Sequence, residues 1–206
     1  MARDATPEHD PITKQRVVVV LLAAGAGSRF VGPQHKLTAR LGGRSIAERA
    51  IASARAADVG PVVIVTGAAE LALPDLPDLH LVRHPNWADG QATSLRAGIE
   101  EADRLGADAV VVGLADQPFV EPEAWRRVAS ATSPIAVATY DGERRNPVRL
   151  HRDVWPLLPT SGDEGARSLI RLRGDLVGEV PCPGSPADID TLEDLRPWQN
   201  RSSTNS

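Results

Sequence analysis

Short apolar runs alternate with amphipathic stretches along most of the chain. Apolar or β-branched runs occupy residues 17–24, 62–66, 79–82, 109–114, 135–139, 148–150 and 176–180, and such runs are typical of strands in a buried sheet. Helical spacing of apolar residues or helix-start signals predict helices over residues 45–57, 92–104 and 164–172, and from Pro122 onward. The alternation predicts an α/β fold: one Rossmann-like three-layer domain with a mainly parallel, twisted sheet.

Two polar segments follow apolar runs directly and are candidates for the functional site. In parallel sheets, ligands bind at the carboxyl ends of the strands. Gly25-Ala26-Gly27-Ser28-Arg29 follows the first run, and its backbone N–H groups could surround a phosphate while Arg29 adds positive charge. Asp116 follows the fourth run and suits a hard cation such as Mg²⁺, which needs only one or two carboxylates beside substrate phosphates.

Composition narrows the class of protein. The chain has 206 residues, a net charge of −4 and no run of eighteen apolar residues, so we expect neither a membrane span nor a nucleic-acid binder that relies on phosphate neutralisation. The single cysteine, Cys182, cannot form an internal disulfide. Residues 1–16 lack the apolar stretch of a signal peptide, which favours the cytoplasm. We expect flexible tails at 1–16 and 199–206 and one domain over 17–198.

Other common sites fit the sequence less well. Phe30 stands where a dinucleotide-binding loop has its third glycine, and Lys36 lacks the Gly-Lys-Ser/Thr context of a P-loop. His80 and His84 are four apart, but Pro85 argues against one helical face for zinc. Ser45 is a better candidate for a helix cap than for a hydrolase nucleophile. Lys36 remains notable because basic positions in this chain are otherwise almost all arginine.

The glycine turn resembles the signature loop of a nucleotidyltransferase superfamily. This superfamily includes the molybdenum cofactor cytidylyl- and guanylyltransferases, the sugar-nucleotide pyrophosphorylases and the methylerythritol cytidylyltransferases. Its Leu-Ala-Ala/Gly-Gly-x-Gly-x-Arg stretch and a downstream lysine match Gly25, Gly27, Arg29 and Lys36. Phe30 replaces the usual methionine, and the longer spacing from Arg29 to Lys36 predicts a bulged loop.

Further segments resemble the molybdenum cofactor cytidylyltransferase branch. Asp116-Gln117-Pro118 is similar to its Asp-Gln-Pro motif, and Asp188-Ile189-Asp190-Thr191 to its Asp-Ile-Asp-Thr ending. Residues 87–95 resemble its Gly-x-x-x-Ser segment, and residues 162–167 its Gly-Asp-x-Gly-Ala-Arg motif. Residues 144–148 correspond to its Arg-Gly-x-Pro-Val stretch, with Arg145 in place of the glycine.

The resemblance implies a nucleotide-diphospho-sugar transferase-like fold and a reaction in which an acceptor phosphate attacks the α-phosphorus of CTP and releases pyrophosphate. It implies Arg29, Lys36 and Asp116 as catalytic residues, and Mg²⁺ on Asp116 and Asp190 with Asp188 in support. The implied acceptor residues are Gln117, Asn146, Pro147, Asp163 and Arg167. The implied nucleotide residues are Leu22, Ala23, Ala24, Gly25, Gly27, Arg29, Lys36, Gly90, Ser94 and Asp116.

The resemblance also suggests substrates and partners. Ala24 favours CTP, because the guanylyl branch usually has glycine there, and the acceptor would be molybdopterin or a similar phosphorylated pterin. A molybdenum hydroxylase or its maturation factor would be a partner. The alternatives are a guanylyltransferase, a transferase with a different phosphorylated acceptor, and a catalytically silent nucleotide-binding maturation partner. The presence of both Asp116 and Asp190 favours an enzyme.

Overall fold

The computed structural model describes residues 15–30 and 34–195. Its strands are β1 (Val17–Ala23), β2 (Arg40–Leu41), β3 (Arg44–Ser45), β4 (Val62–Thr66), β5 (Leu79–Arg83), β6 (Ala109–Leu114), β7 (Ile135–Tyr140), β8 (Glu143–His151) and β9 (Val177–Pro181). Its α-helices are α1 (Ile46–Ala56), α2 (Gln91–Arg104), α3 (Pro122–Ala129) and α4 (Arg167–Leu172). Short 3₁₀ turns are η1 (Lys36–Thr38), η2 (Trp87–Asp89), η3 (Arg152–Leu157) and η4 (Gly174–Leu176).

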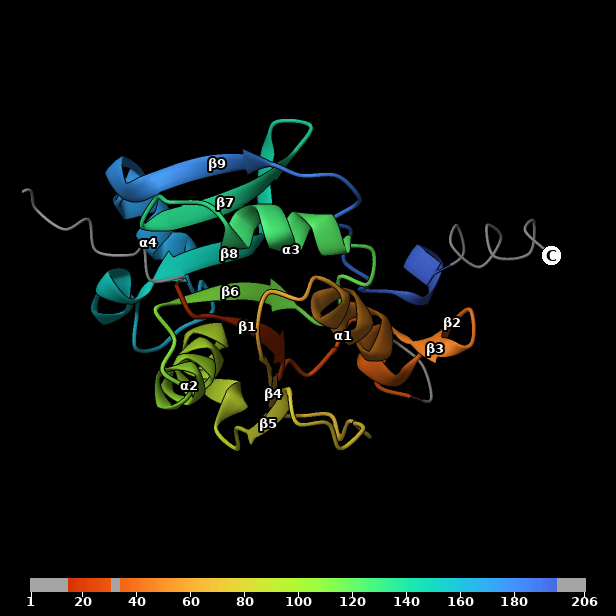
Figure 1. Cartoon of the computed structure of the whole chain (residues 1–206). Helices are drawn as coiled ribbons and strands as arrows, with labels where there is room; N and C mark the ends of the chain where they lie inside the picture. Colours follow the sequence, from red (N-terminus) through yellow and green to blue (C-terminus); the bar gives the residue numbers. More distant parts are fainter. Residues whose placement is uncertain (1–14, 31–33, 196–206) are drawn as a thin grey trace, which may run out of the picture.

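Seven strands form one mostly parallel sheet in the order β5-β4-β1-β6-β8-β7-β9 (Figure 1). The central strand β1 runs parallel to both β4 and β6, with Leu22 opposite Leu114. The strand β8 is the antiparallel member and pairs with β6 and β7. The prediction of an α/β fold with a mainly parallel sheet is therefore confirmed, and the central parallel strands place their carboxyl ends at one edge.

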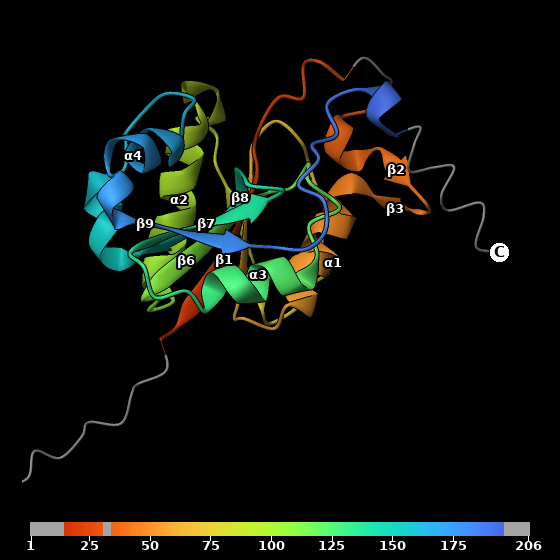
Figure 2. The ribbon, with the colours of Figure 1, turned by 90° about the horizontal axis from the view of Figure 1, so that it is seen from above.

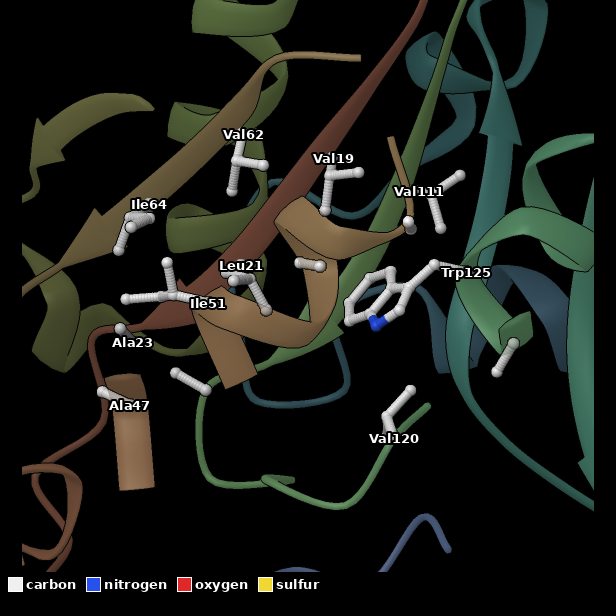
Figure 3. Packing of buried hydrophobic residues seen from close by; sticks show 14 of the residues in the cluster. Val19, Leu21, Ala23, Ala47, Ile51, Val62, Ile64, Val111, Val120 and Trp125 are labelled. Carbon is white, nitrogen blue, oxygen red and sulfur yellow. The ribbon is translucent and has the colours of Figure 1, made fainter. Parts of the chain in front are cut away.

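Helices cover both faces of the sheet, with α1 and α3 on one side and α2 and α4 on the other (Figure 2). The strand β1 is buried along its whole length, so its alternate side chains enter two different cores. Val19 and Leu21 pack with α1 and α3 around Trp125 (Figure 3). Val18 and Val20 pack with α2. Burial on both faces explains why the sequence shows a continuous apolar run here.

The structure differs from the sequence expectations mainly in β8. An apolar run predicts a strand only at 148–150, whereas β8 begins at Glu143 and is antiparallel. Its first residues are charged and exposed, and Arg149 lies buried within it, so apolar patterning misses most of the strand. Arg149 donates hydrogen bonds to the backbone oxygen of Ser133 and to Gln15, which compensates part of its burial. The small hairpin of β2 and β3 also went unpredicted.

The helix starts follow local capping rules. Ser45 caps α1 in a reciprocal capping box with Glu48, which confirms its predicted role as a cap. The proline at the start of α3 occupies the first helical turn, as predicted. The helix α4 begins at Arg167, three residues later than the predicted start at 164.

The chain is anchored to the domain just before β1. The backbone N–H of Arg16 donates to the Asp108 carboxylate at 2.8 Å, and the Arg16 guanidinium donates to the Leu105 oxygen at 3.0 Å. Residues 15 and 16, expected in the N-terminal tail, thus contact the domain, while the rest of that tail and residues 196–206 lie outside the described residues. No helix in the described part is long and apolar enough to cross a membrane.

Replacing Gly113 with alanine should lower the free energy of unfolding by about 1–3 kcal/mol, the usual cost of overpacking a core. Gly113 lies in β6, and a Cβ atom there would come within 2.3 Å of the Trp125 indole. Gly174→Ala is the matched control, because a Cβ there meets no atom within 4 Å. Urea unfolding measures both variants, and equal stabilities would contradict the packing described for Trp125.

Candidate functional site

The site lies where β1 and β6 end side by side. The Ala115 N–H donates to the Leu22 oxygen at 3.0 Å, which continues the parallel pairing one residue past β6. The chain then leaves β1 as the glycine loop and leaves β6 as the segment that carries Asp116. Two adjacent parallel strands therefore bring the predicted phosphate loop and the predicted acidic residue together at the carboxyl edge of the sheet.

The glycine loop is tied to the Lys36 segment by His35. The His35 Nδ1 accepts the Leu37 N–H at 3.2 Å, so its Nε2 carries the proton and donates to the Gly25 oxygen at 3.0 Å. Gly27 has a φ of +61°, and a Cβ there would lie 3.0 Å from the Lys36 Cγ. Close packing against Lys36 and the left-handed backbone together explain glycine at this position.

Lys36 joins two aspartates that are far apart in the sequence. Its Nζ lies 2.5 Å from Asp116 Oδ2 and 3.1 Å from Asp190 Oδ1. The guanidinium of Arg29, which is largely exposed, lies 3.0 Å from the other oxygen of the Asp190 carboxylate. The Lys36 side chain is only 11% exposed, so this ion cluster is partly shielded from water. The structure thus unites the three predicted catalytic residues with the second predicted metal ligand.

The electrostatics of this cluster keep Lys36 charged. Burial opposes its charge, but the adjacent Asp116 and Asp190 carboxylates outweigh that effect and raise the pKa of Lys36 above its ordinary value. Asp188 behaves differently: desolvation, and then the negative charge of Asp116, raise the pKa of its carboxyl. Lys36 is therefore a permanent cation at neutral pH, suited to holding phosphate oxygens rather than to transferring protons.

The C-terminal acidic segment docks beside Asp116 through its backbone. The Ile189 N–H donates to the Asp116 oxygen at 2.9 Å, and the Ile189 side chain is fully buried. Asp188 accepts from the Gln117 Nε2 at 2.8 Å, while Asp190 faces Lys36. Thr191 exchanges capping hydrogen bonds with Asp194, as expected for a helix cap. Because Ile189 is buried in the core, the residues on either side of it, Asp188 and Asp190, both face the site.

A cavity of about 310 Å³ opens beside this cluster. It is lined by the end of β1, the glycine loop and the start of α2, and it includes most of the predicted nucleotide residues. Ser94 and Gly90 are buried in its wall. Gly90 has a φ of +106°, and a Cβ there would lie 2.5 Å from the Gly162 backbone. The predicted residues on the wall are Leu22, Ala23, Ala24, Gly25, Lys36, Gly90, Ser94, Asp116 and Asp163.

Not every predicted residue takes its expected place. Asp163 lines this first cavity, although it was assigned to the acceptor. Gly27 and Arg29 lie outside the lining and contact Lys36 and Asp190 instead. The bulge expected between Arg29 and Lys36 falls partly on residues 31–33, which lie outside the described residues.

The acceptor-side residues gather at a second cavity of about 620 Å³. Gln117, Asn146 and Arg167 line it, and so does Asp188, which was predicted to support the metal ion. Pro147 is buried behind Asn146 and is not among the lining residues, and the peptide between them is cis. The predicted acceptor set is therefore divided between two neighbouring cavities.

Sequence reasoning missed several residues of the site. His35 is one of them, and the only signal for it in the sequence is its position next to Lys36. Its hydrogen bond to the Gly25 oxygen forms only in the folded loop. Gln91 follows Gly90 at the start of α2, inside a segment recognised by resemblance. The unpredicted residues of the first cavity are Ala26, Leu37, Trp87, Ala88, Gln91 and Leu114.

The carboxylates fit a magnesium ion that is shared with substrate phosphates. Within the described ranges, no three His, Cys, Asp or Glu side chains are grouped to hold a metal by themselves. However, Asp116 Oδ1 is buried and has no hydrogen-bond partner in the described structure. An unpaired buried acceptor of this kind is costly unless a ligand satisfies it. Mg²⁺ commonly uses one or two carboxylates and takes its other ligands from phosphates and water.

Curated relatives of this chain are similar over nearly its full length. The purine catabolism protein PucB of Bacillus subtilis (strain 168) is 31% identical, over 86% of this chain and 93% of the relative. The molybdenum cofactor guanylyltransferase of Rhodobacter capsulatus is 28% identical, over 90% of this chain and 96% of the relative.

Solved structures show the same fold. Rv0371c of Mycobacterium tuberculosis H37Rv has a TM-score of 0.77 and 26% identity, covering 91% of this chain and 100% of that one. Its complex with manganese has a TM-score of 0.69 and 24% identity, covering 90% and 98%. A nucleotidyl transferase from Methanothermobacter thermautotroptrophicus has a TM-score of 0.74 and 22% identity, covering 94% and 100%. The fold is thus the nucleotide-diphospho-sugar transferase-like one expected from the resemblance.

The match to a family model agrees with the site geometry. The model of the MobA-like NTP transferase domain matches residues 19–178, which include the glycine loop, Lys36, Asp116 and most of the second cavity. The residues that carry the sequence resemblance are the same ones that the fold gathers at the carboxyl edge of the sheet. This chain belongs to the family of MobA-like NTP transferase domains.

Proposed function

We propose that this protein is a Mg²⁺-dependent cytidylyltransferase that transfers CMP from CTP to a phosphorylated acceptor and releases pyrophosphate. The acceptor that we propose is molybdopterin or its molybdenum-bearing form. Membership of the family supports nucleotidyl transfer, and the relative named as a molybdenum cofactor guanylyltransferase supports the acceptor class. The observation that carries the proposal is the Lys36, Asp116 and Asp190 cluster at the edge of the glycine-loop cavity.

The first cavity suits a nucleoside triphosphate. The glycine loop offers backbone N–H groups, and Lys36 supplies a permanent positive charge at its edge. Arg29, mostly exposed, is free to turn from Asp190 toward the triphosphate, because an exposed ion pair is weak. These two cations would neutralise the triphosphate and the departing pyrophosphate. Ser94 and Asp163 also line this cavity.

Positioning and charge neutralisation account for the reaction without a protein nucleophile. The acceptor phosphate oxygen attacks the α-phosphorus, the bond to the bridging oxygen breaks, and pyrophosphate leaves. Asp116 and Asp190 would hold Mg²⁺, with Asp188 in support through Gln117. When bound, the ion would supply further neutralisation of the phosphate charge. Lys36, released from the carboxylates, would then hold phosphate oxygens.

We expect CTP with Mg²⁺ to raise the midpoint of thermal unfolding by about 5–10 °C. A ligand at one hundred times its dissociation constant adds about 2.7 kcal/mol of stability, which corresponds to a shift of this size in a protein of this length. The measurement compares CTP, GTP, ATP and UTP, each with and without Mg²⁺. A magnesium-dependent shift with CTP alone supports the proposal, and no shift with any nucleotide contradicts it.

A guanylyltransferase is the second candidate, and the Rhodobacter capsulatus relative favours it. Ala24 points instead to cytidylyl transfer, since guanylyl enzymes usually carry glycine at this position. Ala24 lies on the wall of the nucleotide cavity, where an added methyl group alters the space available to the nucleotide. A larger thermal shift with GTP than with CTP would select the guanylyl alternative.

A further inference from the structure

Four arginines line the second cavity. Arg144 and Arg145 reach it from β8, and Arg167 and Arg171 from α4. Asp188 is the only acidic residue on this wall within the described part of the chain. The wall therefore presents four guanidinium groups, three of which also pair with carboxylates just outside it. Guanidinium groups bind carboxylates and phosphates through two parallel N–H donors, so a wall of this kind can bind anions.

The second cavity adjoins the nucleotide cavity through a narrow space of about 40 Å³. This space shares Leu22, Gln91 and Leu114 with the first cavity. It shares Asn146 and Arg167, among others, with the second. A molecule in the second cavity would therefore lie beside a nucleotide in the first, as an acceptor must.

Most of these arginines are oriented by carboxylates that lie outside the cavity wall. Exposed pairs of this kind contribute little energy, and a guanidinium has five N–H donors, so each arginine can bind a further anion. Arg167 and Asn146 are the polar lining residues whose side chains have no hydrogen bond or ion pair within the described structure. The pairs are Arg144–Glu179 at 2.8 Å, Arg145–Glu143 at 2.6 Å and Arg171–Glu164 at 2.8 Å.

An irregularity in β8 shapes this wall. Val148 pairs with Val137, but the next pair along β7 joins Ala138 to Arg145, so Asn146 and Pro147 are inserted out of register. Such bulges redirect side chains and are frequent beside functional sites. Here the bulge lies between Arg145 and Val148, and both Arg145 and Asn146 line the cavity. Arg145 is also the position at which residues 144–148 differ from the Arg-Gly-x-Pro-Val stretch that they resemble.

We propose that the second cavity binds an acceptor that carries a second anionic group in addition to its attacking phosphate. Arg145 and Arg171 hold this second group, while Arg167 and Asn146, on the side shared with the narrow space, hold the acceptor near the nucleotide. The cavity has about twice the volume of the first one, so a lone phosphate would leave most of the arginine wall unused. Arg145 is thus a specificity-determining residue. The inference rests on the proposed function only in taking the bound anion to be the acceptor.

Two small probes of similar shape test the second anionic group. Glycerol 3-phosphate and 3-phosphoglycerate each carry one phosphate, and they differ by a carboxylate in place of a hydroxymethyl group. We expect the full chain to bind 3-phosphoglycerate about tenfold more tightly at low salt, as one charge-assisted hydrogen bond would give. Arg145→Gly should lose most of this preference, because Arg171 alone remains to hold the carboxylate. Isothermal titration calorimetry without nucleotide or metal measures both.

Matched variants separate this site from general charge effects. Arg145→Gln and Arg171→Gln should each reduce the preference, whereas Arg152→Gln, at an exposed ion pair with Asp103, should keep it. Equal binding of the two probes by the unaltered chain, absence of binding at millimolar concentration, or an undiminished preference in Arg145→Gly would overturn the inference. Nucleotide binding is measured separately by thermal unfolding, so either proposal can fail while the other stands.

Discussion

Replacing Asp116 with asparagine is expected to reduce nucleotidyl transfer about 100- to 1,000-fold or more, the usual effect of removing one electrostatic contact to the transition state. Asparagine preserves the shape of the side chain but removes the charge that Asp116 would offer to Mg²⁺. Oδ1 of Asp116 is buried without a hydrogen-bond partner in the described structure, whereas Oδ2 contacts Lys36. Pyrophosphate release from CTP and a phosphorylated pterin acceptor, measured across Mg²⁺ concentrations, gives the effect.

The fold of this variant should be unchanged. Asp116 also hydrogen-bonds the Ile189 N–H through its backbone oxygen, which the substitution leaves in place. Lys36 keeps its contact with Asp190 at 3.1 Å. Asp78→Asn is the matched control, since Asp78 pairs with Arg55 and its backbone oxygen accepts from Val62 at the opposite edge of the sheet. Ordinary activity of Asp116→Asn in Mg²⁺ would refute the catalytic assignment.

Replacing Lys36 with alanine should raise the KM for the nucleoside triphosphate about 10- to 100-fold, the cost of one or two lost charge-assisted hydrogen bonds. The Asp116 and Asp190 carboxylates raise the pKa of Lys36 above its ordinary value, so the lysine is charged at neutral pH, where the loss should be measured. Steady-state kinetics with varied triphosphate measure it. Arg55→Ala, at the surface pair with Asp78, should leave KM unchanged. An unchanged KM in Lys36→Ala would mean that this lysine does not contact the nucleotide.

The same variant has a second readout that does not need turnover. The Nζ of Lys36 contacts both carboxylates that would hold a divalent cation, so a cation that binds without nucleotide must compete with this lysine. Lys36→Ala should therefore bind Mn²⁺ alone about tenfold more tightly than the unaltered chain. Electron paramagnetic resonance of free Mn²⁺ measures the affinity. Weaker Mn²⁺ binding by the variant would place the cation elsewhere.

Strong local patterns predicted much of the fold. The β1 segment is apolar at every position because both of its faces are buried, and its strand assignment was confirmed. Ser45 and Glu48 are three residues apart, and that spacing alone permits the capping box observed at α1. The first half of β8 was not predicted, because its residues are charged and exposed and carry no apolar pattern, although it pairs with β7 across a two-residue turn. Its other pairing, with β6, joins residues about 40 positions apart and leaves no local signal.

Most of the candidate site was predicted as separate motifs rather than as one arrangement. Residue types at strand ends identified the glycine loop and Asp116, and resemblance added Asp190. No spacing indicated that Lys36 would lie between Asp116 and Asp190, 80 and 154 residues away. The resemblance of residues 162–167 implied an acceptor role for Asp163, whereas the fold places it on the wall of the first cavity, beside the glycine loop.

The sequence by itself determined the α/β class, the central strands and the chemical groups available for nucleotidyl transfer, because these depend on side-chain type and short-range periodicity. Only the tertiary structure decided which of these groups meet. The parallel pairing of β1 with β6 brings two loops to one edge, and the Ile189 hydrogen bond adds the distant acidic segment. The bulge in β8 and the position of α4 then form the arginine-lined cavity. Such convergence depends on long-range packing and register, which no local pattern encodes.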